Sequence, residues 1–518
     1  MQSKAPYAAL HPVPGEVSCI ETHVSWVFLT GPCAYKLKKP LRLPFLDYST
    51  ADRRAALCRE ELRLNRRHAP GLYVDVVPIT GTPGHPVVGG DERLAFEHAL
   101  RMVQFDPALE LTHLLQARRV EPAAIAALGE SLARMHAEAE RAVPGCGYGA
   151  PAAVHRVTLE NFVELETLLQ GPDSTRLVAV RSRLDTLFAH GRDLMRRRCG
   201  RDCVRECHGD LHCGNVVCWQ GRLVAFDGLE FDPALRYVDV ASDIAFLAMD
   251  LGARGRDDLR RVLLDAWTSA SGDYEAIALL AYYEAYRALV RAKVTALRRQ
   301  QVGDAVSNAN ASPDYLGWIQ HQAQRRAPTL VVLAGLSGSG KTTLARRLGP
   351  ALEALHVRSD VERKRLAGLG PLESSRSAAD AGIYTLAFSE RTYDRLAQCV
   401  DACLAGGESV IVDAANLRRH ERERFAAIAA ARGAPIVLVH CTAPLEVLRA
   451  RVAQRAATEH DASEATVGLL DRQPGYWESL TRAELEHALV VDTQEPTAVA
   501  AAIDTLAQRC APGLRPHR

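Results

Sequence analysis

Residues 329–349 read TLVVLAGLSGSGKTTLARRLG, an apolar run followed by a glycine-rich turn and then by good helix formers. The centre of this stretch, GLSGSGKT (335–342), satisfies the pattern G-x-x-x-x-G-K-[ST]. A strand before such a turn and a helix after it form the context in which backbone N–H groups wrap a phosphate. The stretch therefore predicts an α/β nucleotide-binding fold around it.

The sequence that follows repeats this alternation of apolar runs and helical patterns. Short apolar runs occur in HVRSD (356–360), SVIVDA (409–414) and PIVLVHC (435–441). Between and after them lie helical patterns such as RERFAAIAAARG (422–433) and PLEVLRARVAQRAA (444–457). Apolar strands that alternate with helices are typical of a parallel sheet covered on both faces.

The glycine-rich turn supplies the groups that a nucleotide phosphate requires. Its glycines let the backbone approach the phosphates, Lys341 reaches the β- and γ-phosphates, and the Thr342 hydroxyl is a ligand for Mg²⁺. ATP and Mg²⁺ are therefore the predicted cofactors. The residues predicted to bind them here are Gly335, Ser337, Gly338, Ser339, Gly340, Lys341, Thr342 and Thr343.

Other polar residues of this half follow the strands or lie on a later helix. Asp413 ends an apolar strand, where a carboxylate would hold Mg²⁺ or its water. Asp360 follows another strand, and it is predicted either to accept the acceptor's proton or to cap the next helix. Three arginines on one helical pattern are predicted to clamp the transferred phosphate, although a solvated face is an equal interpretation: Arg449, Arg451 and Arg455.

Residues 328–515 resemble the P-loop kinases of the polynucleotide-kinase and zeta-toxin type. The resemblance rests on the phosphate-binding loop and on the positions of Asp360 and Asp413, and it implies phosphate transfer from ATP to a hydroxyl group. Within it, residues 461–478 would form a mobile lid. Tyr476 and Trp477 at the end of that lid would either stack on a base or pack inside the domain.

The N-terminal half carries a second set of candidate phosphotransfer residues. In HGDLHCGNVV (208–217), Asp210 can accept a hydroxyl proton and Asn215, five residues later, can bind Mg²⁺. In LVAFDGLEF (223–231), Asp227 ends an apolar strand and can hold Mg²⁺ against the phosphates.

A lysine to grip the nucleotide is expected on a strand upstream. VSWVFLTG (24–31) and CAYKLKKP (33–40) predict a hairpin, and TADRRAALCREELRLNRRH (50–68) predicts a helix capped by its threonine. Lys36 is predicted to grip the phosphates, with Lys38 as the alternative. The carboxylate partner on the helix is Glu60 or Glu61; spacing does not choose between them, and we favour Glu60 slightly.

Residues 15–300 resemble the aminoglycoside phosphotransferase and choline kinase-like family, whose loop has the form H-G-D-x-x-x-x-N followed by an Asp at a strand end. The resemblance implies a protein-kinase-like α+β fold with two lobes and a small-molecule hydroxyl acceptor. Gly209 stands where protein kinases have an arginine. Asp243 in ASDIAFLAMDL resembles the aspartate that supports the catalytic loop in this family.

A change of composition at residues 298–318 separates the two halves, because Gly, Asn, Ser and Pro interrupt a helical pattern there. The predicted domains are 1–310, a linker at 311–327, and 328–518. This order resembles fused proteins in which an aminoglycoside-phosphotransferase-like domain precedes a P-loop kinase. The leading hypothesis is a bifunctional kinase; the alternatives are that one domain is a nucleotide-sensing regulator, or that the second is a nucleic-acid end kinase.

Charge and cysteine usage limit the partners. The 518 residues hold 63 Lys and Arg against 62 Asp and Glu, so no overall field draws the chain to nucleic acid or to a membrane. The four arginines of NLRRHERERF (416–425) alternate with glutamates, which favours a salt-bridged helix over a nucleic-acid surface. We expect small-molecule acceptors, a cytoplasmic location and reduced thiols for the 13 cysteines; those at 199–218 are expected to be buried thiols rather than zinc ligands.

Overall fold

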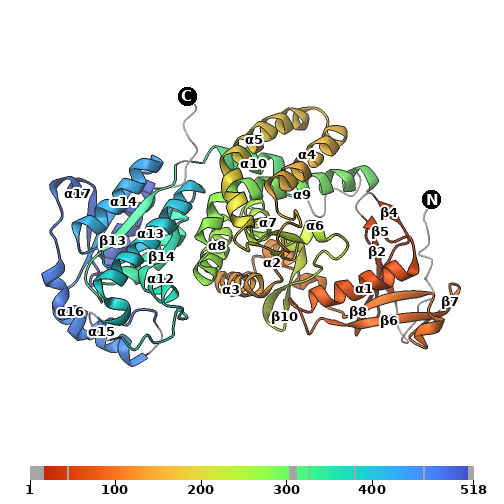
Figure 1. Ribbon diagram of the computed structural model, residues 1–518, viewed down its shortest axis with the longest axis horizontal. Coiled ribbons are helices and arrows are strands. Elements are labelled where there is room, and N and C mark those ends of the chain that lie inside the picture. The colour runs from red at the N-terminus through yellow and green to blue at the C-terminus, as the bar shows by residue number, and fades with distance from the viewer. Residues whose placement is uncertain are drawn as a thin grey trace. The chain divides into compact units, whose positions relative to one another are not determined.

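The computed structural model of the chain describes residues 17–43, 46–302, 312–325, 327–377, 381–458 and 461–510 (Figure 1). By packing, the chain divides into two compact units. The first comprises Met1–Arg156 and Met195–Asp250, and the second comprises Val157–Leu194 and Leu251–Arg518. Among the described helices, none has both the length and the apolar character needed to cross a bilayer.

The first unit begins with an antiparallel sheet in the order β1-β2-β3-β8-β6-β7. Its strands are β1 (Ser18–Glu21), β2 (Ser25–Leu29), β3 (Cys33–Lys38), β6 (Tyr73–Thr82), β7 (His85–Val88) and β8 (Glu97–Val103). The predicted hairpin is confirmed, because β2 pairs with β3 in the register Val27 to Lys36. The predicted helix is α1 (Ala51–Asn65), whose N-cap Thr50 accepts a hydrogen bond from the backbone N–H of Arg53.

The rest of the first unit surrounds the HGDLHCGNVV segment. A short turn of helix at Cys213–Asn215 leads into the hairpin of β10 (Val216–Trp219) and β11 (Arg222–Ala225). The helix α7 (Val240–Ala253), whose Asp250 accepts the backbone N–H of Cys213, is buried over its residues 240–252. The other elements of this part are β4 (Arg42–Leu43), β5 (Leu46–Asp47), α2 (Leu111–Gln116), α3 (Pro122–Glu138), β9 (Val204–Glu206), α6 (Pro233–Arg236) and β12 (Tyr237–Asp239).

The second unit contains the predicted parallel sheet, which is confirmed. Its strands lie in the order β14-β15-β13-β16-β17, and every neighbouring pair is parallel. The strands are β13 (Leu330–Ala334), β14 (Leu355–Arg358), β15 (Val410–Asp413), β16 (Ile436–Thr442) and β17 (Ala488–Asp492). All five residues of the central strand β13 are buried. The strand β17 was not predicted from the sequence.

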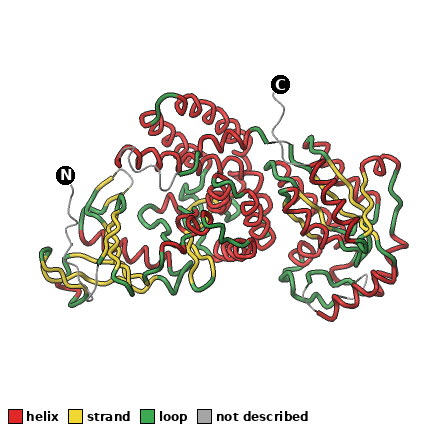
Figure 2. The backbone as a smooth tube through the Cα atoms, turned by 180° about the vertical axis from the view of Figure 1, so that it is seen from behind, coloured by secondary structure: helices red, strands yellow, loops and turns green. Residues whose placement is uncertain are grey.

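Helices flank this sheet (Figure 2). On one face, α11 (Lys341–Leu352) and α18 (Pro496–Cys510) join alternate residues of β13 and β16 in a single apolar core. Leu344, Leu348 and Leu506 are at most 1% exposed there, and burial of each leucine stabilises the fold by about 1.5–3 kcal/mol. The elements that contact the sheet and one another elsewhere are α12 (Ser359–Leu366), α13 (Leu386–Ala405) and α14 (Arg419–Arg432).

Helices that precede the parallel sheet in sequence belong to the same compact unit. The carboxylate of Asp265 on α8 (Asp257–Ser271) accepts the backbone N–H of His356, at 2.6 Å, on the edge strand β14. The buried Arg260 of α8 pairs with Glu284 and with Glu408, which precedes β15. The Asp265 contact covers the backbone of the edge strand β14, and the Arg260 contact joins α8 to the segment before β15. These contacts help to explain why the helices belong to the same compact unit as the sheet.

The compact units therefore divide the chain differently from the predicted domains 1–310 and 328–518. The predicted linker contains α10 (Tyr315–Ala323), in which Tyr315, Leu316, Trp318 and Ile319 are buried against α9 (Leu280–Val302). Residues 303–311, which are part of the predicted boundary region 298–318, lie outside the described residues. The remaining helices are α4 (Pro151–Leu168), α5 (Pro172–Cys199), α15 (Leu445–Thr458), α16 (Val467–Arg472) and α17 (Arg482–His487).

Candidate active sites

The glycine-rich turn between β13 and α11 has the shape of a phosphate cradle. Gly338 and Gly340 have φ values of +80° and +79°, which other residues adopt only with strain. A Cβ atom at Gly335 would lie 2.3 Å from the carbonyl oxygen of Cys441, so this position excludes a side chain. Gly340 caps α11 without a side-chain hydrogen bond, which leaves the helix N-terminus available to an anion.

Lys341 lies folded over this turn. Its Nζ donates to the carbonyl oxygens of Gly335 and Leu336 at 2.8 and 2.9 Å. Burial lowers the pKa of Lys341, and the charge of Asp413 opposes that effect. Ser339 is buried beneath the turn, whereas Ser337, Gly338, Gly340, Lys341, Thr342 and Thr343 line a cavity of about 1130 Å³.

Thr342 and Asp413 meet at the edge of this cavity. The Thr342 hydroxyl donates to Asp413 Oδ2 at 2.7 Å, and His356 Nε2 lies 3.0 Å from the same oxygen. Burial acts to raise the pKa of Asp413, but the hydrogen bond and charge of His356, the charge of Lys341 and the Thr342 hydroxyl hold it at about 2. A hydroxyl beside an ionised carboxylate fits the oxygen ligands that Mg²⁺ prefers. His356 was not predicted from the sequence, because no motif includes it.

This pKa predicts a dependence of stability on pH. The folded pKa of about 2 lies below the ordinary 3.8, so Asp413 stabilises the fold above pH 3.8 and loses this effect as the pH falls toward 2. The difference corresponds to about 2 kcal/mol. We expect the free energy of unfolding, measured with urea in the absence of Mg²⁺, to decrease as the pH is lowered from 4.5 to 2.5. The decrease should be smaller for Asp413→Asn than for the parent.

The control for that experiment is Asp401→Asn, since Asp401 pairs with Arg432 on the surface. This variant should keep the pH dependence of the parent. If the free energy of unfolding changed equally with pH in the parent and in Asp413→Asn, the assignment of Asp413 as an ionised carboxylate would be wrong.

Asp360 lines the same cavity. It is the second residue of α12, and the N-cap of that helix is Arg358. The interpretation of Asp360 as the helix cap is therefore wrong, and its role as a base stays a prediction.

The three predicted clamp arginines divide into two groups. Arg451 and Arg455 lie four residues apart on one face of α15 and line the cavity. Arg451 is fixed by Thr493 Oγ1, at 2.9 Å, and by the carbonyl oxygen of Thr493, at 3.0 Å. Arg449 points to another face and pairs with Asp471 at 2.9 Å. The prediction that Arg449 contacts the nucleotide is wrong, because a two-residue step on a helix turns the side chain away from the cavity.

Arg363, which the sequence analysis missed, also lines the cavity. Its side chain is 9% exposed, and its NH1 group donates to the Ile383 carbonyl oxygen and to Ser389 Oγ. Its Nε is buried without an acceptor and its guanidinium lies over the ring of Tyr384, but no carboxylate of the described residues forms an ion pair with it. A buried guanidinium without a carboxylate partner favours an anionic ligand. The D-x-x-R spacing from Asp360 was a signal that could have found it.

Gln473 is a second missed residue of the phosphate-binding turn. It lies after α16, accepts the backbone N–H of Ser337 at 2.7 Å and donates to Ser337 Oγ at 3.0 Å. Of the two aromatic residues that follow, Trp477 stacks on His440 with ring centroids 4.3 Å apart, so it packs inside the domain. Tyr476 lines the cavity under the guanidinium of Arg418.

Two of the four arginines of NLRRHERERF form ion pairs with carboxylates outside that segment. Arg422 is buried and pairs with Glu484, and Arg424 pairs with Glu390 and Asp394. The guanidinium of Arg418 lies over the ring of Tyr476 instead. The predicted salt bridges are therefore confirmed for Arg422 and Arg424, although their partners are not the neighbouring glutamates that the sequence suggested.

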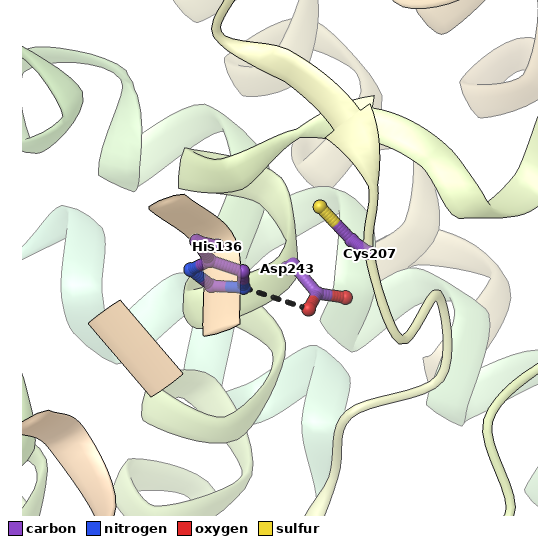
Figure 3. A group of neighbouring side chains, drawn as sticks. All are labelled: His136, Cys207 and Asp243. Atoms are coloured by element: carbon purple, nitrogen blue, oxygen red, sulfur yellow. Dashed lines mark hydrogen bonds and ion pairs between the residues drawn. The ribbon is translucent and has the colours of Figure 1, made fainter. Parts of the chain in front are cut away.

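The second site lies in the first unit, where Asp243 holds the HGD turn. Its two carboxylate oxygens accept the backbone N–H groups of His208 and Gly209 at 3.2 and 2.9 Å, and His136 Nε2 lies 3.1 Å away (Figure 3). Gly209 has a φ of +81°, and a Cβ atom there would lie 3.0 Å from the carbonyl oxygen of Leu235. The expected supporting position of Asp243 is confirmed.

The group of His136, Cys207 and Asp243 has the donor atoms of a metal site but the bonding of a structural network. Asp243 already accepts two backbone N–H groups, and the Cys207 thiol donates to the carbonyl oxygen of Val238. Among the described residues the cysteines are free thiols. The network therefore serves to fix the loop that carries Asp210.

Asp210 and Asn215 are brought together at the end of this loop. Asn215 Nδ2 donates to the backbone carbonyl of Asp210 at 2.9 Å and to its carboxylate at 3.1 Å. The side chain of Asp210 is 38% exposed, so a small molecule with a hydroxyl group can reach it. This is the arrangement that a base beside a metal-binding amide requires.

Lys36 and Asp227 also meet. Lys36 Nζ donates to Asp227 and to Glu61 Oε1, the latter at 2.7 Å. Asp227 has a φ of +61° and is held there by a hydrogen bond from its N–H to the Tyr73 hydroxyl at 2.9 Å. A left-handed aspartate is strained, and such strain is common at functional sites.

The choice of Glu60 as the partner of Lys36 is wrong. Glu60 pairs with Arg63 and Arg236, each at 2.7 Å, whereas the fully buried Glu61 faces β3. Adjacent helix residues differ by about 100° in direction, so only one of them can point at the sheet. Lys38 also contacts Glu61, at 2.6 Å.

Comparison with known proteins places the chain in a family. "Uncharacterized protein Rv2004c" of Mycobacterium tuberculosis is 30% identical over 472 residues, which cover 90% of this chain and 93% of that protein. The chain belongs to the Rv2004c family. Since the match covers nearly the whole length of both proteins, the Rv2004c family shares both halves of the chain. In addition, the family model described as an AAA domain matches residues 330–480, which include the phosphate-binding turn.

Two solved structures also resemble parts of this chain. A choline/ethanolamine kinase family protein from Mesorhizobium loti has a TM-score of 0.33 and 12% identity, over 60% of this chain and 86% of that one. A sugar kinase from Janibacter sp. HTCC2649 has a TM-score of 0.28 and 24% identity, over 37% of this chain and 99% of that one. At these TM-scores, neither likeness assigns a substrate.

Proposed function

We propose that the chain is a bifunctional phosphotransferase that depends on ATP and Mg²⁺. Residues 1–310 and 328–518 each move the γ-phosphate of ATP to a hydroxyl group of a small-molecule or nucleotide-like acceptor. The observation that supports this most is the presence of two complete sets of groups, one around Lys36 and Asp227 and one around Lys341 and Asp413. Because each set is built into a different fold, the two sets need a nucleotide each.

In the N-terminal module, which we propose has the two-lobe kinase fold, Asp210 accepts the proton of the acceptor hydroxyl. Lys36 neutralises the nucleotide phosphates, and Asn215 and Asp227 hold Mg²⁺. When bound, ATP with its metal ion supplies the phosphoryl group. The protein's part is to hold these charges in place, which is most of what phosphoryl transfer requires.

In the C-terminal module, the turn at 335–342 binds phosphate through its N–H groups and Lys341. Thr342 and Asp413 hold Mg²⁺, while Arg451 and Arg455 offset the charge that develops on the transferred group. Asp360 takes the proton of the acceptor hydroxyl.

The acceptor of the C-terminal module carries an anionic group in this proposal. Arg363 and Asp360 lie three residues apart on α12 and both line the cavity. A carboxylate or phosphate on the acceptor would pair with Arg363 and bring a hydroxyl group to Asp360.

Arg363→Ala is expected to raise the KM for the acceptor by about 10- to 100-fold, since a buried charged hydrogen bond is worth about 1.5–3 kcal/mol. The KM for ATP should change little. Steady-state kinetics with the acceptor found for this module measure both values, and Arg449→Ala serves as the control because Arg449 pairs with Asp471 away from the cavity. An unchanged acceptor KM in Arg363→Ala would contradict the anionic acceptor.

A calorimetric titration of the intact chain with a non-hydrolysable ATP analogue and Mg²⁺ tests the presence of two sites. We expect two nucleotides per chain, and one in a Lys341→Ala variant. A single nucleotide in the intact chain would contradict the proposal.

One observation favours a second candidate, in which the N-terminal module senses nucleotide without transferring phosphate. The turn after β1, where a flexible phosphate-covering loop is expected, contains no glycine. Within it, the backbone N–H of Ser25 donates to Thr22 Oγ1 at 2.9 Å. For a nucleic-acid end kinase the support is weaker, because Arg422 and Arg424 are engaged in ion pairs.

A further inference from the structure

A second lysine lies behind the proposed nucleotide lysine, in a sealed cluster of charges. Lys38 Nζ donates to Glu61 Oε2 at 2.6 Å, to Glu230, and to the Tyr48 hydroxyl at 3.2 Å. Tyr48 donates in turn to Glu230. Lys38, Glu61 and Tyr48 are at most 1% exposed and Glu230 is 6% exposed, so solvent does not screen these contacts.

Lys36 and Lys38 divide the two oxygens of Glu61 between them. Lys36 binds Oε1 at 2.7 Å and Lys38 binds Oε2 at 2.6 Å, because residues two apart on β3 share a face. The side chain of Lys36 is 14% exposed and extends to Asp227, whereas that of Lys38 is 1% exposed. Of the two, only Lys36 is open toward a nucleotide.

The cluster also connects the sheet to the segment that carries Asp227. Glu230 follows Asp227 by three residues, and both are held by lysines of β3. The contacts form a closed ring: Lys36 to Glu61, Glu61 to Lys38, Lys38 to Glu230, and back through the backbone to Asp227 and Lys36.

We propose that Lys38 and Glu230 are positioning residues of the N-terminal site, which fix Glu61 and the segment that carries Asp227. Lys36 and Asp227 are thereby held in the orientation that binds the phosphates and metal of ATP. This inference rests on the proposed function of that site. Lys38 does not touch the nucleotide. Without it, the buried Glu230 would have no lysine partner, and Oε2 of Glu61 would lose its lysine. Lys36 alone would then hold the Glu61 carboxylate, whose orientation would be less restricted.

The test is calorimetric titration of ATP analogue and Mg²⁺ into the full chain, in a Lys341→Ala background so that only the N-terminal site is read. Thermal melting is recorded for each variant in parallel. Lys36→Met should remove binding. Lys38→Met should weaken affinity by roughly 10- to 100-fold and lower the melting temperature, while Lys38→Arg should recover part of both.

The double variant Lys38→Met/Glu230→Gln separates positioning from stability. This variant removes the buried charges of Lys38 and Glu230 together, so its melting temperature should return close to that of the parent. The affinity for the ATP analogue should stay low, because Glu61 has lost its second lysine. Arg59→Met is the control, since Arg59 on α1 pairs with Glu92 and both side chains are exposed, and it should change neither quantity.

Two results would overturn the inference: full affinity in Lys38→Met, or affinity that returns together with the melting temperature in the double variant. The second result would show that the pair only stabilises the fold. Unchanged binding in Lys36→Met would instead refute the proposed function of the N-terminal site, and the inference with it.

Discussion

Lys341→Ala is expected to abolish measurable ATP binding at the C-terminal site and to lower phosphate transfer there by at least about 10²- to 10³-fold, as loss of one preorganised charge donor does. Lys341 is the cation of the phosphate-binding turn, and its ammonium group donates to three neutral oxygens: the carbonyls of Gly335 and Leu336 and, at 3.4 Å, Ser339 Oγ. A phosphate would replace these neutral acceptors with a charged one.

The folded state should survive this change, because Asp413, whose charge Lys341 helps to stabilise, keeps its contacts with His356 and the Thr342 hydroxyl. Binding and transfer at the N-terminal site should be unaltered. The measurements are calorimetric titration and product analysis. Normal turnover of the C-terminal product in Lys341→Ala would exclude this turn as its active site.

Asp210→Asn is expected to lower phosphate transfer at the N-terminal site by about 10²- to 10⁴-fold, the usual contribution of a general base. The amide keeps the shape of the carboxylate but cannot take a proton. The loop should stay in place, because Asp243 holds it through the backbone of His208 and Gly209.

ATP affinity at that site should change little, since Lys36 and Asp227 are intact. Single-turnover kinetics would separate the chemical step from binding. The control is Asp202→Asn, a surface aspartate that pairs with Arg141. If Asp210→Asn lost ATP binding and turnover in equal measure, Asp210 would be a binding residue and the assignment as a base would be wrong.

The elements that could be predicted from the sequence are those whose signal is local. The turn at 335–342 is coded by its own glycines, and the buried strands β13, β15 and β16 are continuous apolar runs. The strand β17 escaped because it lies at the edge of the sheet, where Val490 is 58% exposed and the apolar run is short.

The candidate sites show the same limit. Asp210, Asn215 and Asp227 follow a fixed spacing and were found. The choice between Glu60 and Glu61 depends on how α1 rotates against the sheet, which packing decides and spacing does not. His356 and Gln473 act on residues 57 and 136 positions away, so no local pattern could reveal them.

The division into compact units was also beyond the sequence. Arg260 and Asp265 look like ordinary surface residues of an amphipathic helix, yet they bond to Glu408 and to the backbone of His356. Such contacts join segments about 90 to 150 positions apart, and only the folded chain shows them.

The most direct test of two independent phosphotransfer sites is transfer of labelled γ-phosphate from ATP into a pool of hydroxyl-bearing metabolites. The intact chain is compared with Asp210→Asn and Lys341→Ala. We predict that each variant loses a different phosphorylated product and keeps the other. Loss of the same product in both variants, or no loss in one variant whose site still binds ATP, would contradict the account and leave the chain with a single active site.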